Sequence, residues 1–257
     1  MLSSPGKFET ATRLGFAARA VMYALIGYLA LRTGRTEDGA GVIDYLDTGG
    51  GRILLAAMAV GFLGYGVWRL LDAWSDASGH GDDAKGLAIR GGGAVSGLIH
   101  LGLGVLALAS AAGLRGGGGG GATEQGAATA LSLPGGWIML LAAAAALLAT
   151  GIVQLGKSWK LGFLRNLSPP PHVRRWVAWL GRAGYLARGI VFLIIAWFFS
   201  RAAMAERSEQ AGGIAEALAS LPSTPQMLVA AGLLLFGLFS LVEARYRRIP
   251  RPDMLSR

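Results

Sequence analysis

Six blocks of apolar residues, separated by polar segments rich in glycine, proline and charge, dominate the pattern along the chain. Each block has about 16–20 residues and almost no charge, close to the ~20 residues with which a helix crosses the ~30 Å hydrocarbon core of a bilayer. Backbone groups find no water there and must pair within the segment, so we expect helices rather than strands. The pattern predicts an all-α integral membrane protein with transmembrane helices at about 16–32, 53–72, 94–112, 137–156, 186–205 and 226–243.

Lysine and arginine are distributed unequally between the two sides of these spans. Of the 24 in the chain, 18 lie on the side that carries both termini and 6 lie on the other. Short cytoplasmic loops concentrate lysine and arginine, so we expect both termini to be cytoplasmic. The net charge of +9 is then an orientation signal, with the basic side against anionic lipid headgroups, and no nucleic-acid partner is expected.

A unit of two helices recurs three times along the chain. The segment Arg13-Leu-Gly-Phe-Ala-Ala-Arg19 reappears as Arg182-Ala-Gly-Tyr-Leu-Ala-Arg188, and Arg90 begins the matching segment of the middle unit. Because each unit has two spans, the three units run parallel, which implies a pseudo-threefold bundle if they close on each other. The units are expected at 13–76, 86–160 and 176–248, followed by a basic C-terminal tail at 249–257.

The second helices of the three units also match one another. The connections between the two helices match too, and each connection carries a short, mildly amphipathic stretch. Charged residues are rare in such helices, so matching charges argue against chance similarity between segments of like composition. Three sets of matching positions are Gly61, Ala146 and Gly232; Gly66, Gly151 and Gly237; and Asp72, Lys157 and Glu243.

The Arg-x-Gly-[Phe/Tyr]-x-Ala-Arg opening, the Gly-rich outer turn and the Gly-Tyr-Gly-x-Trp-Arg run at Gly64 to Arg69 resemble a bacterial membrane family called domain of unknown function 1206. Its members similarly have up to three tandem two-helix units. The resemblance covers about 13–248 and implies the fold and a place in the bacterial cytoplasmic (inner) membrane. It implies no activity, cofactor or substrate. The middle unit departs from the pattern, with Ser96 where the other two units have arginine and with Gln154 in place of Arg69.

Four charged residues near the cytoplasmic ends of the spans are candidates for ion pairs at the membrane interface. Arg19 and Arg188 lie about a turn and a half inside the first helix of their units, and Asp72 and Glu243 lie at the end of the second helix. An unpaired charge inside the membrane costs several kcal/mol. The hypothesis is therefore an Arg19–Asp72 pair and an Arg188–Glu243 pair, each within one unit. Alternatively, the arginines snorkel to the headgroups and the acids face water independently.

His100 and Gln154 are the candidate polar residues inside the membrane. His100 could be a haem ligand or a proton relay, but the other histidines, His80 and His172, fall in connections. A histidine that is hydrogen-bonded to a neighbouring helix is the favoured interpretation. The chain has no cysteine, no HExxH motif and no plausible nucleophile–base–acid set. We therefore expect no catalytic residues, no metal ligands and no cofactor.

Two main classes of function are compatible with these features. The first hypothesis is a non-enzymatic membrane protein that packs with a membrane partner or with a second copy of itself, because small-residue helix faces favour close packing. The alternative is a small-solute or ion transporter or channel along the pseudo-threefold axis, although a pathway would normally show a polar lining. A further alternative is a membrane-bound enzyme or a haem protein.

Overall fold

The computed structural model describes residues 7–48, 50–76, 79–114 and 121–248, and over these ranges the chain folds into helices with no β-strand. The expected C-terminal tail at 249–257 lies outside the described residues. In chain order, the elements are α1 (Lys7–Thr33), α2 (Gly39–Thr48), α3 (Arg52–Ser75), α4 (Ala84–Ala111), α5 (Ala122–Leu131), α6 (Gly136–Lys160), η1 (Gly162–Asn166), α7 (Arg174–Ala205), η2 (Ser208–Gln210), α8 (Ile214–Ala219) and α9 (Ser223–Tyr246).

Six of these helices are long and apolar enough to cross a membrane: α1, α3, α4, α6, α7 and α9. They coincide with the six expected spans, so the all-helical architecture with six candidate membrane helices is confirmed for the described residues. The largest difference is α7, which begins at Arg174 and so extends about three turns before the expected start at 186. The short helices α2, α5 and α8 occupy the three connections in which amphipathic stretches were expected.

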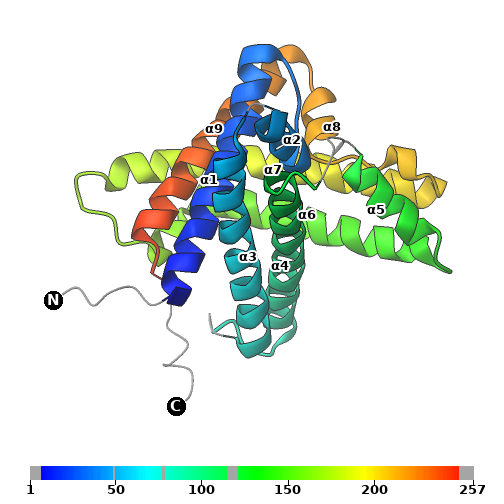
Figure 1. The fold of residues 1–257 in the computed structure, drawn as a ribbon. Coiled ribbons are helices and arrows are strands. Elements are labelled where there is room, and N and C mark those ends of the chain that lie inside the picture. Colours follow the sequence, from blue (N-terminus) through cyan, green and yellow to red (C-terminus); the bar gives the residue numbers. More distant parts are fainter. Residues whose placement is uncertain (1–6, 49, 77–78, 115–120, 249–257) are drawn as a thin grey trace.

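The six long helices contact one another in the order α4, α3, α1, α9, α7, α6. The first unit closes on itself through α1 and α3, and the third through α7 and α9. Over the described residues, by contrast, α4 and α6 of the middle unit form no extended interface; α4 packs along α3 and α6 packs along α7. In Figure 1, α3 and α4 run down the picture whereas α6 and α7 run across it, so the two halves of the middle unit diverge.

Contacts between successive units use one set of matching glycines. A methyl group added to Gly66 of α3 would lie 2.9 Å from the carbonyl oxygen of Gly97 in α4. One added to Gly151 of α6 would lie 3.2 Å from the carbonyl oxygen of Gly189 in α7. The third contact joins the last unit to the first, because a methyl group on Gly237 of α9 would lie 2.8 Å from the carbonyl oxygen of Ala20 in α1. Small residues thus let the backbones approach at all three junctions.

Contacts within a unit use a second set of small residues, and they form in the first and third units. A methyl group on Gly15 would lie 2.8 Å from the carbonyl oxygen of Gly61. In the third unit, one on Gly184 would lie 2.7 Å from the Cα atom of Phe236. These glycines keep α1 close to α3 and α7 close to α9.

The equivalent positions of the middle unit are not packed against another helix among the described residues. Gly91 and Gly92 of α4 have nothing within 4 Å of an added methyl group in the described structure. On α6, Ala146 and Thr150 are exposed, and on α4 Val95 is 54% exposed. The face of α4 around Gly92 and the face of α6 around Ala146 correspond to faces that pack together in the other two units. In the middle unit, neither face has a helix against it among the described residues.

Candidate functional site: a charged layer inside the bundle

Arg19 and Glu243 form an ion pair across the interface between α1 and α9. Arg19 is 8% exposed and Glu243 is 1% exposed. The Arg19 Nε donates a hydrogen bond to the Ser240 hydroxyl at 3.3 Å, and Arg247 donates to the Oε1 atom of Glu243 at 2.6 Å. The pair is buried and makes further hydrogen bonds to Ser240 and Arg247, and it joins the last unit of the chain to the first.

The expected Arg19–Asp72 pair does not form in the described structure, and this corrects the sequence hypothesis. Asp72 is buried and accepts a hydrogen bond at 3.3 Å from Arg69, one turn earlier on the same helix. Arg19 turns instead toward α9, because the close approach of Gly237 to α1 brings Glu243 next to its guanidinium group. The pairing thus connects two units instead of clamping one.

The expected Arg188–Glu243 pair is also replaced. The Arg188 guanidinium carbon lies over aromatic rings, 4.5 Å from the centroid of Phe236 and 5.1 Å from that of Tyr23. Its Nε atom is buried and has no hydrogen-bond partner in the described part of the chain. Glu243 is already paired with Arg19 and Arg247, and within the described residues the contacts of Arg188 are cation–π contacts.

Gln154 and Lys157 take the equivalent places on α6. Gln154 is 6% exposed, and its Oε1 atom finds no partner within the described residues. The Lys157 ammonium lies 5.6 Å from the centroid of the Tyr185 ring, on α7. By repeat register, Gln154 and Lys157 correspond to Ser240 and Glu243, so a lysine stands where the last unit has its carboxylate.

His100 lies part-way along α4, against the rings of Phe62 and Tyr65, with centroids 5.9 and 4.6 Å away. Its Nδ1 atom is 2.7 Å from the carbonyl oxygen of Ser96, which only accepts, so Nδ1 carries the proton and donates. The hydrogen bond is made to its own helix and not to a neighbouring one as expected. Its Nε2 atom is buried and has no partner in the described structure.

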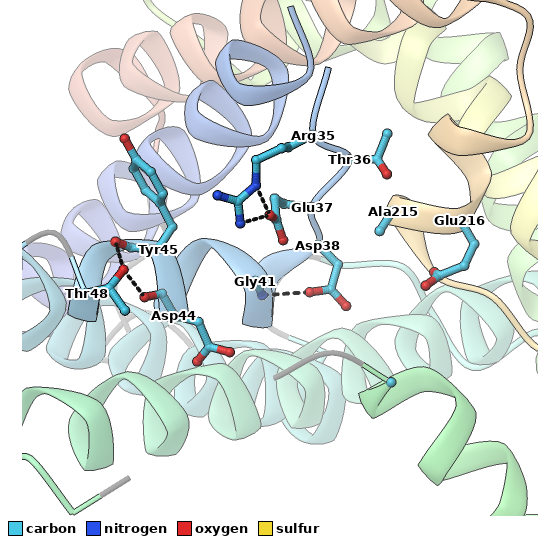
Figure 2. A pocket seen from close by; sticks show the side chains of 11 residues that line it. Arg35, Thr36, Glu37, Asp38, Gly41, Asp44, Tyr45, Thr48, Ala215 and Glu216 are labelled. Atoms are coloured by element: carbon cyan, nitrogen blue, oxygen red, sulfur yellow. Dashed lines mark hydrogen bonds and ion pairs between the residues drawn. The ribbon is translucent and has the colours of Figure 1, made fainter. Parts of the chain in front are cut away.

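A separate pocket of about 340 Å³ lies among the connections on the other side of the bundle, between α2 and the start of α8 (Figure 2). Its charged side chains serve local structure. Arg35 donates to Glu37 at 2.8 Å, and Asp38 accepts from the backbone of Gly41 at 2.9 Å at the start of α2. Across the described ranges, no group of three or more His, Cys, Asp or Glu side chains is arranged to hold a metal ion.

Three partners in this layer were not among the sequence candidates: Arg69, Ser240 and Arg247. Ser240 could have been found, because it occupies the position of Arg69 and Gln154 in its own unit. The repeat register identifies equivalent positions, but it does not indicate that the partners of Arg19 come from another unit, the third. That information lies in the helix order α9–α1.

Six apolar helices arranged as three two-helix units define a multi-pass membrane protein built from repeats. The chain belongs to the family described as Domain of Unknown Function (DUF1206), which it matches at residues 14–76, 91–160 and 183–247. It is also 29% identical over 250 residues to "Uncharacterized protein YxxB" of Bacillus subtilis (strain 168), covering 92% of this chain and 90% of that protein. No solved structure matches the chain. The three matched segments correspond to the three units, so the family resemblance of the sequence is confirmed.

Proposed function

We propose that this chain is a non-enzymatic component of the bacterial cytoplasmic membrane, with both termini in the cytoplasm, that pairs with a second copy of itself through its middle unit. The observation that carries the proposal is the open face of that unit. Gly92 of α4 and Ala146 of α6 stand at positions that are packed in the other two units.

The repeat itself indicates what covers these faces. In the first and third units, the first helix of the unit packs against the second: α1 against α3, and α7 against α9. The face of α4 around Gly92 is therefore complementary to the face of α6 around Ala146. Both carry small residues, and in a bilayer helix association depends on such close packing, because lipid tails are as apolar as the side chains they replace.

A two-fold dimer fills both faces at once. If α4 of the first copy packs against α6 of the second, two-fold symmetry places α4 of the second copy against α6 of the first, and the interface is closed. The pseudo-threefold arrangement of helices would then be completed twice, with the missing within-unit contact made between chains. Pairing with a second copy thus needs no further protein.

The charged layer also favours a structural role over a catalytic one. Asp72 and Glu243, its two buried carboxylates, are held by the arginines Arg69, Arg19 and Arg247. Both carboxylates are buried and engaged by guanidinium groups, so neither lies open to a substrate. The excess of lysine and arginine on the side of the termini fits contact with anionic headgroups in a positive-inside orientation.

The oligomeric mass tests the proposal. The full chain, extracted into lipid nanodiscs directly from membranes, is expected to contain two copies, and Ala146→Trp, which adds bulk to the open face, is expected to give one. The matched control is Val60→Trp, an exposed position of α3 away from the middle unit. A wild-type particle with one copy, or equal loss of dimer in both variants, would contradict the proposal.

A further inference from the structure

The first and third units make the same side-chain contact between their two helices. In the first unit, the guanidinium carbon of Arg19 lies 5.9 Å from the centroid of the Tyr65 ring, on α3. In the third unit, that of Arg188 lies 4.5 Å from the centroid of the Phe236 ring, on α9. Arg188 occupies the position of Arg19 in the repeat register. Phe236 likewise occupies the position of Tyr65. Each closed unit therefore places an arginine of its first helix over an aromatic ring of its second.

The close contacts near these side chains are also equivalent in the two units. A methyl group added to Gly61 would lie 3.0 Å from the Cβ atom of Ala18. In the third unit, one added to Gly232 would lie 2.5 Å from the Cβ atom of Ala187. These two pairs occupy the same positions in the repeat register. The two closed units share one packing geometry, so they predict which residues of α4 and α6 meet when the same contact forms between two chains.

In the middle unit, both members of this side-chain contact are replaced by residues with a hydroxyl group. Ser96 of α4 stands at the arginine position, and Thr150 of α6 stands at the aromatic position. Ser96 is half-buried and Thr150 is exposed. The Thr150 hydroxyl donates to the carbonyl oxygen of Ala146, on its own helix, at 2.7 Å. A guanidinium group on a face that lipid covers would cost free energy, whereas a hydroxyl group bonded to its own helix is satisfied there. The middle unit thus tolerates lipid and still offers polar groups to a second chain.

We infer that the Ser96 hydroxyl of one chain donates a hydrogen bond to the Thr150 hydroxyl of the second, and that this contact distinguishes a second copy from a merely apolar helix. The inference rests on the proposed pairing through the middle unit and adds the residues that select the partner. A hydroxyl oxygen has two lone pairs, so Thr150 accepts from Ser96 while its own proton stays on the carbonyl oxygen of Ala146. Two-fold symmetry forms the contact twice. Such bonds between helices favour association in a bilayer, where burial of apolar surface does not.

Removal of one hydroxyl group at a time tests the contact. Full chains with donor and acceptor fluorophores would be placed in liposomes over a range of protein-to-lipid ratios, and energy transfer would give the dissociation constant of the dimer. One such hydrogen bond is worth about threefold in an equilibrium constant, so Ser96→Ala and Thr150→Val, which each remove two, should each raise the dissociation constant about tenfold. The double variant should be no weaker than the weaker single variant, because both changes remove the same bonds.

Two control variants accompany these changes. Thr150→Ser keeps the hydroxyl group and should stay within about twofold of the wild type. Ser200→Ala removes a hydroxyl group that also bonds to its own helix, at 2.9 Å from the carbonyl oxygen of Ala196, but it lies on α7. It should likewise change the dissociation constant by less than about twofold.

The outcomes separate this inference from the pairing on which it rests. A wild type that pairs, together with Ser96→Ala and Thr150→Val variants that pair within about twofold as well, would overturn the hydrogen bond and leave the pairing of two chains intact. Losses that add in the double variant would also overturn it, because the two hydroxyl groups would then act separately. A wild type that stays monomeric at every protein-to-lipid ratio would contradict the pairing itself, and the inference with it.

Discussion

Arg19 and Glu243 lie 224 residues apart in the chain and form one buried ion pair, which joins the first helix of the first unit to the last helix of the third. The guanidinium group of Arg13 reinforces the same junction, since it donates to the carbonyl oxygen of Ala244 at 2.6 Å. The two ends of the folded chain are therefore fastened together at one end of the bundle. The remaining opening falls at the middle unit, between α4 and α6.

The Arg19–Glu243 pair predicts a specific coupling. Arg19→Leu alone leaves a buried carboxylate short of its partner and should lower the free energy of unfolding by about 3–5 kcal/mol. The double variant Arg19→Leu/Glu243→Leu should lose much less than the sum of the two single variants. Thermal unfolding in detergent, followed by circular dichroism, measures both. The same cycle with Asp72→Leu should be additive, and coupling of Arg19 to Asp72 in place of Glu243 would contradict the observed pairing.

The glycine at the α9–α1 junction predicts sensitivity to side-chain size. A methyl group on Gly237 would lie 2.6 Å from the backbone nitrogen of Ala24, so Gly237→Leu must force the two helices apart. We expect a loss of about 1–3 kcal/mol of stability. Gly102→Leu on α4 is the matched control, because nothing described lies within 4 Å of it. If both variants melt at the same temperature, the close approach of α1 and α9 does not stabilise the fold.

Asp76 predicts a pH dependence in the connection between α3 and α4. Backbone hydrogen bonds from His80 and Gly81, at 2.7 and 2.8 Å, lower the pKa of its carboxyl group. A lowered pKa means that the stabilisation is present above the ordinary aspartate pKa, about 3.9, and is lost as the pH falls through the lower pKa of the folded state. Amide exchange at His80 and Gly81 should therefore be slower in the wild type than in Asp76→Ala at pH 7, and the difference should shrink as the pH falls below the ordinary aspartate pKa. An unchanged ratio across this range would show that the carboxylate does not hold the turn.

The expected orientation predicts which connections are accessible from outside the cell. The chain has no cysteine, so any labelling of a variant with one introduced cysteine comes from that position. Asp44→Cys, in α2, should react with a membrane-impermeant maleimide in intact cells, whereas Ser168→Cys, between α6 and α7, should react only after the membrane is broken. Labelling of Ser168→Cys alone in intact cells would place the termini outside.

The sequence predicts the helices and the repeat well, for a physical reason. Crossing hydrocarbon requires long uncharged segments, and such segments are visible without knowledge of their neighbours. The partners of the charged residues were not predictable in the same way. Arg19 could pair within its unit or with the preceding one, and the choice depends on which small residues bring helices together. Gly237 brings α9 to α1, and this contact lies between residues more than 200 positions apart.

The open middle unit illustrates the same limit. Gly92 and Ala146 match residues that are packed elsewhere, so the register alone predicts a closed unit. Closure depends on competition between interfaces, and α4 and α6 instead pack along their neighbours α3 and α7. The connection between α4 and α6, residues 112–135, is also longer than the corresponding connections at 34–51 and 206–222, which leaves the two helices more freedom to separate.

Disulfide trapping in the membrane tests whether two chains pair through the middle unit. Chains with Gly92→Cys and chains with Ala146→Cys, carrying different tags, would be produced in the same membrane and oxidised. Pairing through the middle unit predicts a covalent dimer that contains both tags. The control pair Val60→Cys and Leu228→Cys, at exposed positions on α3 and α9, should give little of this dimer. The absence of a dimer with both tags, or a Gly92→Cys/Ala146→Cys double variant that links only within one chain, would contradict pairing through the middle unit.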